Sequence, residues 1–134
     1  MQAAGKLQQI SFQEFNALSS DFTIPKADVI WLSQFLDCFS EAEIIAILKN
    51  IAGQLSTATK VFIMETFWDN QRFPAASYAI AATSVYFTAV ANGNSKMYGL
   101  KEMTELVEQA GLFIEKLHSN VGISHTILQC RLRD

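Results

Sequence analysis

The sequence predicts an α/β fold with a mostly parallel sheet and an antiparallel closing strand. Short apolar segments rich in β-branched residues alternate with longer segments of helical periodicity along most of the chain. The last two strand-like segments, 113–118 and 124–132, follow each other without an intervening helix, which predicts an antiparallel edge. Half of the 134 residues are hydrophobic, enough to build the core of one domain.

Three further segments are predicted as strands. Residues 10–12 form a short candidate, whereas 28–32 and 60–64 are nearly all apolar, as expected for strands buried on both faces. Glu65 closes the last of these strands.

Three segments are predicted as helices. Ser40 and Glu43 have the spacing of a capping box and start a helix with apolar residues at helical intervals. Residues 73–91, rich in alanine and aromatic residues, are interpreted as one mostly buried helix. Residues 100–110 are amphipathic, and Gly111 is well placed to end them.

Composition excludes several classes of partner. The net charge is −3 and the ten Lys and Arg residues are scattered, unlike the clustered basic surface of a nucleic-acid-binding protein. The apolar stretch 75–91 is interrupted by polar residues and is shorter than the ~20 residues of a membrane span. Cys38 and Cys130 lack metal-ligand spacing, and His118 and His125 are isolated, so we expect no metal site. Free thiols predict a reducing compartment and a soluble, cytoplasmic protein.

In sheets of this kind, ligands bind beyond the carboxyl ends of the strands. Two positions are therefore candidates for a site: residues 33–39, after the second strand, and Glu65, after the third. The six glycines are isolated, and none opens a helix after a strand, so the sequence contains no glycine-rich phosphate or nucleoside loop.

Residues 28–41 and 47–50 resemble the fourth strand and following helix of S-adenosylmethionine-dependent O-methyltransferases that act on small hydroxylated aromatics. That family has Asp and three apolar residues, then Leu-His-Asp-Trp-Ser-Asp-Glu, and later Ile-Leu-Lys-Asn. Residues 60–65 are similar to its fifth strand with the terminal acidic residue, and 108–112 are similar to the end of its last helix.

The resemblance implies a partial Rossmann-like methyltransferase fold. The family's first two strands, glycine-rich cofactor loop and N-terminal dimerisation domain would lie before residue 1. Residues 1–134 are thus interpreted as the C-terminal portion of a class I catalytic domain, from a truncated gene product or a deliberate fragment. Residues 10–12 would be the third strand, too far from 28–32 to pair with it. We expect that open edge to be covered by a homo-oligomer or another chain, or by a repositioned N-terminal segment.

The resemblance also supplies two candidate catalytic residues. Asp37 aligns with the family's His, which removes the proton of the substrate hydroxyl; the alternative is that Asp37 caps the helix starting near Ser40. Glu65 aligns with an acidic residue that orients a substrate or partner, and the alternative is a solvated strand end. Tyr98 to Leu100 stand where the family has Arg-Thr-Glu. These differences from the family, at the His and Arg-Thr-Glu positions, leave open a methyl transfer that depends only on holding donor and acceptor close together.

The implied cofactor is S-adenosylmethionine and the implied partner is a small-molecule substrate. The residues aligned with the cofactor site are Asn16, Ala17, Ser33, Gln34 and Phe39. The residues where the family lines its substrate pocket are Tyr78, Phe87, Asn92, Asn94 and Tyr98, for whose aromatic members core packing is the alternative.

The resemblance thus predicts transfer of a methyl group to a hydroxyl of a small, aromatic metabolite. Nitrogen or carbon acceptors remain open. Because the glycine loop is missing, we expect the 134-residue chain alone to be inactive. The rival hypothesis is a non-catalytic remnant that acts only as an interaction or structural module.

Overall fold

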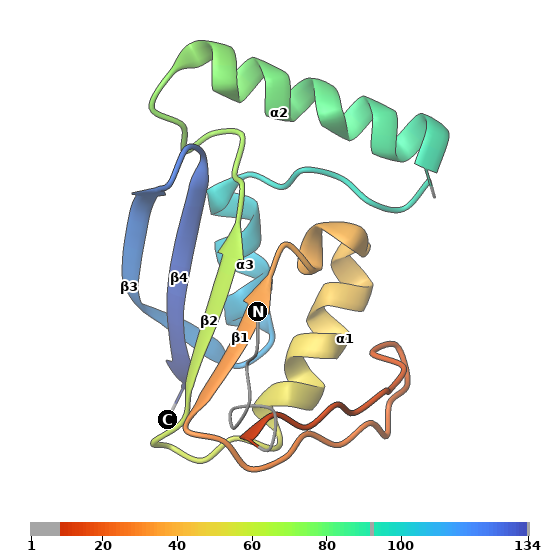
Figure 1. The fold of residues 1–134 in the computed structure, drawn as a ribbon, viewed down its shortest axis with the longest axis vertical. Helices are drawn as coiled ribbons and strands as arrows, with labels where there is room; N and C mark the ends of the chain where they lie inside the picture. Colours follow the sequence, from red (N-terminus) through yellow and green to blue (C-terminus); the bar gives the residue numbers. More distant parts are fainter. Residues whose placement is uncertain (1–8, 92, 134) are drawn as a thin grey trace, which may run out of the picture.

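Four strands form one sheet in the order β1-β2-β4-β3 in the computed structural model, which describes residues 9–91 and 93–133 (Figure 1). The strands are β1 (Val29–Ser33), β2 (Lys60–Glu65), β3 (Leu112–Val121) and β4 (His125–Leu132). The helices are η2 (Leu36–Cys38, a 3₁₀ turn), α1 (Glu41–Ala52), α2 (Pro74–Tyr86), η3 (Phe87–Ala91, a π-helical segment) and α3 (Leu100–Gln109).

The predicted α/β class with a partial Rossmann-like sheet is confirmed. β1 and β2 are parallel, and β4 runs antiparallel to both of its neighbours, β2 and β3. The prediction of a mostly parallel sheet with an antiparallel edge is wrong in two respects: two of the three pairings are antiparallel, and the antiparallel strand β4 lies inside the sheet. The reason is the tight turn at Gly122 (φ 61°), which folds β4 back along β3 and leaves its other side to pair with β2.

The helix α1 begins as its sequence predicts. Ser40 is the N-cap: its hydroxyl accepts a hydrogen bond from the Glu43 amide (3.4 Å), and the Glu43 carboxylate accepts one from the Ser40 amide (2.8 Å). This reciprocal pair satisfies two backbone donors that a helix start leaves free. It fixes the start of α1 immediately after η2.

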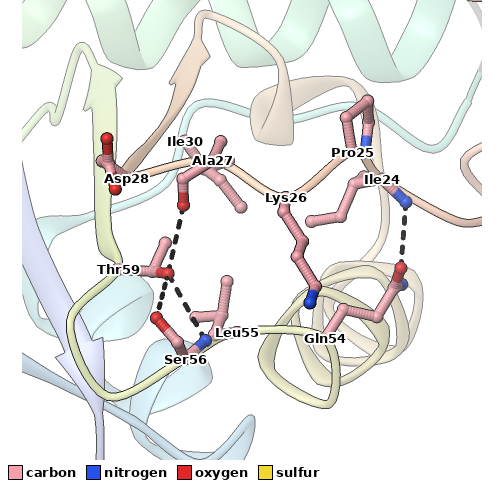
Figure 2. Close-up of a pocket in the computed structure, with 10 residues that line it drawn as sticks. All are labelled: Ile24, Pro25, Lys26, Ala27, Asp28, Ile30, Gln54, Leu55, Ser56 and Thr59. Carbon is pink, nitrogen blue, oxygen red and sulfur yellow. Dashed lines mark hydrogen bonds between the residues drawn. The ribbon is translucent and has the colours of Figure 1, made fainter.

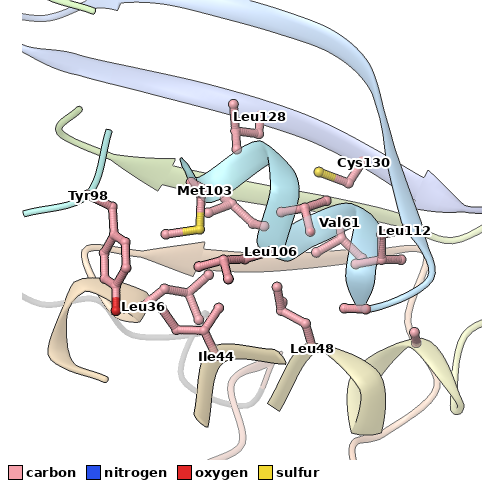
Figure 3. Packing of buried hydrophobic residues seen from close by; sticks show 14 of the residues in the cluster. Leu36, Ile44, Leu48, Val61, Tyr98, Met103, Leu106, Leu112, Leu128 and Cys130 are labelled. Atoms are coloured by element: carbon pink, nitrogen blue, oxygen red, sulfur yellow. The ribbon is translucent and has the colours of Figure 1, made fainter. Parts of the chain in front are cut away.

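The core lies between one face of the sheet and the helices α1 and α3 (Figure 3). Val61 and Ile63 of β2 point into it, as does Leu128 of β4, and all three are fully buried. Because side chains alternate along a strand, Phe62 faces the opposite side, where its ring stacks on Trp31 at 5.6 Å.

Residues 10–12, predicted as a strand, have no strand structure. Phe12 is 92% exposed, and a lone extended segment has no neighbour with which to share backbone hydrogen bonds. Among the described residues β1 pairs only with β2, so none of them adds a strand along its outer edge. Cover by another chain remains a prediction.

The expectation of one mostly buried helix over residues 73–91 is also wrong. The segment is α2 followed by η3, and no described residue of either is buried. Figure 1 shows the reason: α2 runs across the carboxyl end of the sheet, beyond the layer in which α1 and α3 pack. No helix in the described ranges has the length and apolar character needed to cross a membrane.

Candidate functional site

The candidate site begins where β1 ends. Gln34 follows with φ 46°, a left-handed conformation that turns the chain sharply, and its amide donates to the Met64 carbonyl of β2 (2.8 Å). The chain then enters η2, which contains Asp37. The two carboxyl ends of β1 and β2 thus meet at η2, the position that the sequence predicted.

Glu65, the last residue of β2, fastens the start of η2. One of its carboxylate oxygens, Oε1, accepts hydrogen bonds from the amides of Phe35 (3.0 Å) and Leu36 (2.9 Å). The other, Oε2, is buried without a hydrogen-bond partner among the described residues. Burial and the nearby negative charge of Asp37 raise the pKa of Glu65 to about 7, although the two amide bonds oppose the shift. The interpretation of Glu65 as a solvated strand end is therefore wrong.

Asp37 is half-buried beside this carboxyl group. Burial raises the pKa of Asp37, and a hydrogen bond from the Cys38 thiol (3.6 Å) partly offsets the shift. The helix-cap interpretation of Asp37 is wrong, because Ser40 caps α1. Its role as a base remains a prediction.

The segment before α3 holds η2 from its other side. The Lys96 amide donates to the Asp37 carbonyl (3.2 Å), and the Ser95 hydroxyl donates to the Cys38 carbonyl (3.3 Å). The Tyr98 hydroxyl donates to the Phe39 carbonyl at 2.6 Å. Sequence reasoning missed Ser95 and Lys96, because nothing in the local sequence signals contacts between segments so far apart along the chain.

Lys96 is not available as a proton acceptor. Its ammonium group lies 2.8 Å from Glu41, also bonds Glu102, and sits 4.7 Å from the ring centre of Tyr98. Burial disfavours its charge, but the hydrogen bonds to Glu102 and Glu41 outweigh burial and raise the pKa of Lys96. The cluster ties the first turns of α1 and α3 together.

An apolar cavity of about 450 Å³ runs along the open edge of β1. It brings together two of the predicted cofactor residues, Ala17 and Ser33. Its aromatic lining consists of Phe15, Phe22, Trp31 and Phe35.

The other predicted cofactor residues lie outside this lining. Asn16 accepts a hydrogen bond from the Leu18 amide (3.0 Å) in a local turn, and Gln34 is exposed. Phe39 packs edge-on against Phe35, with ring centres 5.0 Å apart.

The predicted substrate residues are not gathered in one place. Tyr98 is buried in the core, and Asn94 donates to Glu43 at the start of α1. Tyr78 is 78% exposed on α2, and Phe87 packs edge-on against Tyr86. Asn92 lies outside the described residues.

A second cavity, of about 420 Å³, lies at the amino end of β1 (Figure 2). Its lining comes from residues 24–28 and 54–56, with Ile30 and Thr59. Thr59 donates to the Ala27 carbonyl (3.2 Å) and bonds Ser56, so part of its polar lining is already satisfied. It contains none of the residues predicted for the site, and it lies at the end of the strand opposite to η2.

A family model for an O-methyltransferase domain matches residues 1–113. The chain belongs to this O-methyltransferase family. A comparison with curated proteins found no significant match.

Several solved structures share the fold of this O-methyltransferase domain. TnmH is 18% identical with a TM-score of 0.80, and the alignment covers 98% of this chain and 37% of that one. OxaC, in complex with SAH and oxaline, is 17% identical with a TM-score of 0.78 over 96% of this chain and 31% of its own. The O-methyltransferase NcsB1 from neocarzinostatin biosynthesis, in complex with S-adenosyl-L-homocysteine and 1,4-dihydroxy-2-naphthoic acid, is 22% identical with a TM-score of 0.66 over 85% and 32%. The chain spans about a third of the length of these structures.

Proposed function

We propose that this O-methyltransferase domain takes part in the transfer of a methyl group from S-adenosylmethionine to a hydroxyl group of a small, aromatic metabolite. As part of the proposal, residues 1–134 form the C-terminal portion of a class I catalytic domain. The observation that carries the proposal is the pair of carboxyl groups, Asp37 and Glu65, held together at the carboxyl ends of β1 and β2 with raised pKa values.

The cavity beside β1 suits one part of the donor. Flat aromatic walls from Trp31 and Phe35 fit a nucleobase, and the Ser33 hydroxyl can bond a ribose. We propose Asn16, Ala17, Gln34 and Phe39 as the surrounding contacts. Bound S-adenosylmethionine supplies an electrophilic methyl group on its sulfonium.

Asp37 is proposed as the base. A phenol, with a pKa near 10, is a poor nucleophile until its proton is removed, and a carboxylate Oδ of Asp37 would take that proton. Burial makes this carboxylate a stronger base than an exposed one. A protonated Glu65 would reduce the repulsion that a second negative charge exerts on Asp37, and it would keep η2 in place through its two backbone contacts.

Structural relatives support the class of acceptor. NcsB1 binds a dihydroxynaphthoic acid and OxaC binds oxaline, both small molecules. For this chain, Tyr78, Phe87, Asn92, Asn94 and Tyr98 remain the proposed substrate-side residues. The free thiols of Cys38 and Cys130 support a cytoplasmic location, which is part of the same proposal.

The experiment is a methyl-transfer assay of the complete protein with labelled donor and hydroxylated aromatics, comparing wild type with Asp37→Asn. We expect turnover to fall at least ~100-fold, the lower end for general-base catalysis, with donor binding nearly unchanged. Cys38→Ser is the matched control, because it alters the neighbouring side chain and leaves the carboxylate. Equal turnover in Asp37→Asn would show that Asp37 is not the base. The rate enhancement would then come from the proximity of donor and acceptor alone.

A second function, an interaction module without catalysis, is favoured by two observations. The sequence has no glycine-rich nucleoside loop, and β1 has an outer edge without a strand among the described residues. Such an edge presents unpaired amides and carbonyls to another chain. Calorimetry separates the two: micromolar binding of S-adenosylmethionine to the 134-residue chain would exclude the module, whereas undetectable binding together with edge pairing would support it.

A further inference from the structure

Residues 94–98, called the bracing segment below, lie along the backbone of the turn that carries the proposed base. The segment donates hydrogen bonds to three consecutive carbonyl groups, those of Asp37, Cys38 and Phe39. The bond to the Asp37 carbonyl comes from the backbone amide of Lys96 and measures 3.2 Å. The position of Asp37 therefore depends on how firmly the bracing segment is held.

The side chain of Lys96 fastens the bracing segment to two helices at once. Its ammonium group lies 2.8 Å from the carboxylate of Glu41 and also bonds Glu102. Glu41 lies in the first turn of α1, and Glu102 lies in the first turn of α3. The ammonium group also sits 4.7 Å from the ring centre of Tyr98, whose hydroxyl makes the bond to the Phe39 carbonyl. One positive charge thus joins two carboxylates on separate helices to the segment between them.

Further hydrogen bonds, independent of the Lys96 side chain, also hold the bracing segment. Among them, the Asn94 side chain donates to Glu43 near the start of α1, and the Met97 amide donates to the Ser84 hydroxyl of α2 (2.7 Å). These bonds remain when the ammonium group is removed. Loss of the ammonium group should therefore loosen the segment without unfolding the protein.

We propose that Lys96 is a positioning residue for Asp37. Its two ion pairs hold the bracing segment on η2, and the segment keeps water away from the Asp37 carboxylate. The consequence for catalysis rests on the proposed function, in which Asp37 is the base. The link between Lys96 and the position of Asp37 is independent of that function.

The proposal predicts how the proton affinity of Asp37 responds to Lys96. Beside the Asp37 carboxylate lie the Cys38 thiol, on the same turn, and the Glu65 carboxyl group, at the end of β2, while the Lys96 ammonium is directed to the two helix carboxylates. Burial is the largest cause of the raised pKa of Asp37. When the bracing segment loosens, water reaches the carboxylate and its pKa falls toward the ordinary value of 3.8. A carboxylate with a lower pKa is a weaker base, so removal of the substrate proton slows.

The test is the pKa of the Asp37 carboxyl group, measured by NMR in the 134-residue chain and in its variant Lys96→Met. Methionine keeps an apolar stem beside the Tyr98 ring and lacks the charge. We expect the pKa of Asp37 to fall toward 3.8 in the variant. Hydrogen exchange of the Cys38 and Phe39 amides should become about 5-fold faster, the scale of two partly exposed ion pairs.

Three further variants test the assignment to this ammonium group. Lys101→Met removes an 87% exposed lysine in the first turn of α3, 4.0 Å from Glu105, and should change neither the pKa nor the exchange rates. Lys96→Arg should keep both near their wild-type values, because a guanidinium can bond two carboxylates. Glu41→Gln removes one partner and keeps Lys96, so it should shift both quantities in the same direction by a smaller amount.

Activity of the complete protein provides a separate readout. Lys96→Met should lower turnover and move the acid limb of the pH profile to lower pH, with donor binding nearly unchanged. An unchanged pKa of Asp37 in Lys96→Met, or in Glu41→Gln when Lys96→Met does not fold, would overturn the proposal. An acid limb that stays in place while Asp37→Asn is inactive would also overturn it. Equal turnover of wild type and Asp37→Asn would instead reject Asp37 as the base, and a shifted pKa of Asp37 would still support the link to Lys96.

Discussion

The carboxylate of Glu65 accepts a hydrogen bond of 2.9 Å from the backbone amide of Leu36, and this contact joins the end of β2 to the turn that follows β1. Both residues are buried: Leu36 is fully buried and Glu65 is 2% exposed. Asp37 follows Leu36, so the position of the proposed base depends on a buried carboxyl group that titrates near neutrality.

Stability should therefore fall as the pH rises. The folded-state pKa of Glu65 is about 7 and its ordinary value is 4.5, so the folded protein holds this proton more tightly than the unfolded chain does. The contribution of Glu65 to the free energy of unfolding is fully present below pH 4.5. It decreases as the pH rises to about 7, and the total decrease is about 3 kcal/mol at most.

Glu65→Gln tests this pH dependence, because it keeps an acceptor for the Phe35 and Leu36 amides and cannot ionise. Urea unfolding near pH 4.5 and near pH 8 should show a smaller loss of stability for the variant than for wild type. Glu105→Gln, at an exposed site on α3, is the control and should leave the pH dependence unchanged. If Glu65→Gln kept the same pH dependence of stability as wild type, a group other than Glu65 would be responsible for it.

Tyr98→Phe should destabilise the protein by about 1–3 kcal/mol, because it leaves the Phe39 carbonyl without its donor. Denaturant unfolding measures the loss. Tyr86→Phe, at a 58% exposed position, is the matched control and should change stability by less than about 0.5 kcal/mol. Equal stability of wild type and Tyr98→Phe would show that the hydroxyl is free for another role, such as substrate binding.

Ser40→Ala should cost about 1 kcal/mol, the typical value for loss of a helix N-cap, because it removes the acceptor for the Glu43 amide. Ser11→Ala, at an exposed position in the N-terminal segment, should have no measurable effect. Thermal unfolding of both variants provides the comparison, and similar melting temperatures for Ser40→Ala and wild type would refute the capping role.

The parts of the fold that sequence predicts are those with local signals. The capping box of Ser40 and Glu43, the apolar run of β2 and the two closing strands each depend on near neighbours, and each is present. The location of Glu65 after β2 follows from the same local pattern.

The rest depends on contacts that no local pattern encodes. An apolar composition predicts burial for α2, whereas the structure leaves none of its residues buried. The bonds from Ser95 and Lys96 to η2, and from Tyr98 to Phe39, join segments more than fifty residues apart (57 for Ser95 and 59 for Tyr98). Tyr98 is an example: its aligned position predicted a place in the substrate pocket, whereas the structure places it in the core.

The measurement that tests the account most directly is an NMR titration of the ¹⁵N-labelled 134-residue chain with S-adenosylhomocysteine. Because the sequence has no glycine-rich loop, we expect binding weaker than micromolar, with shifts confined to Asn16, Ala17, Trp31, Ser33 to Phe39, and Glu65. That result would place the donor at the carboxyl ends of β1 and β2, beside the proposed base. Shifts centred on residues 24–28 and 54–59, around the cavity at the amino end of β1, would contradict the proposed site, as would no shift at millimolar ligand.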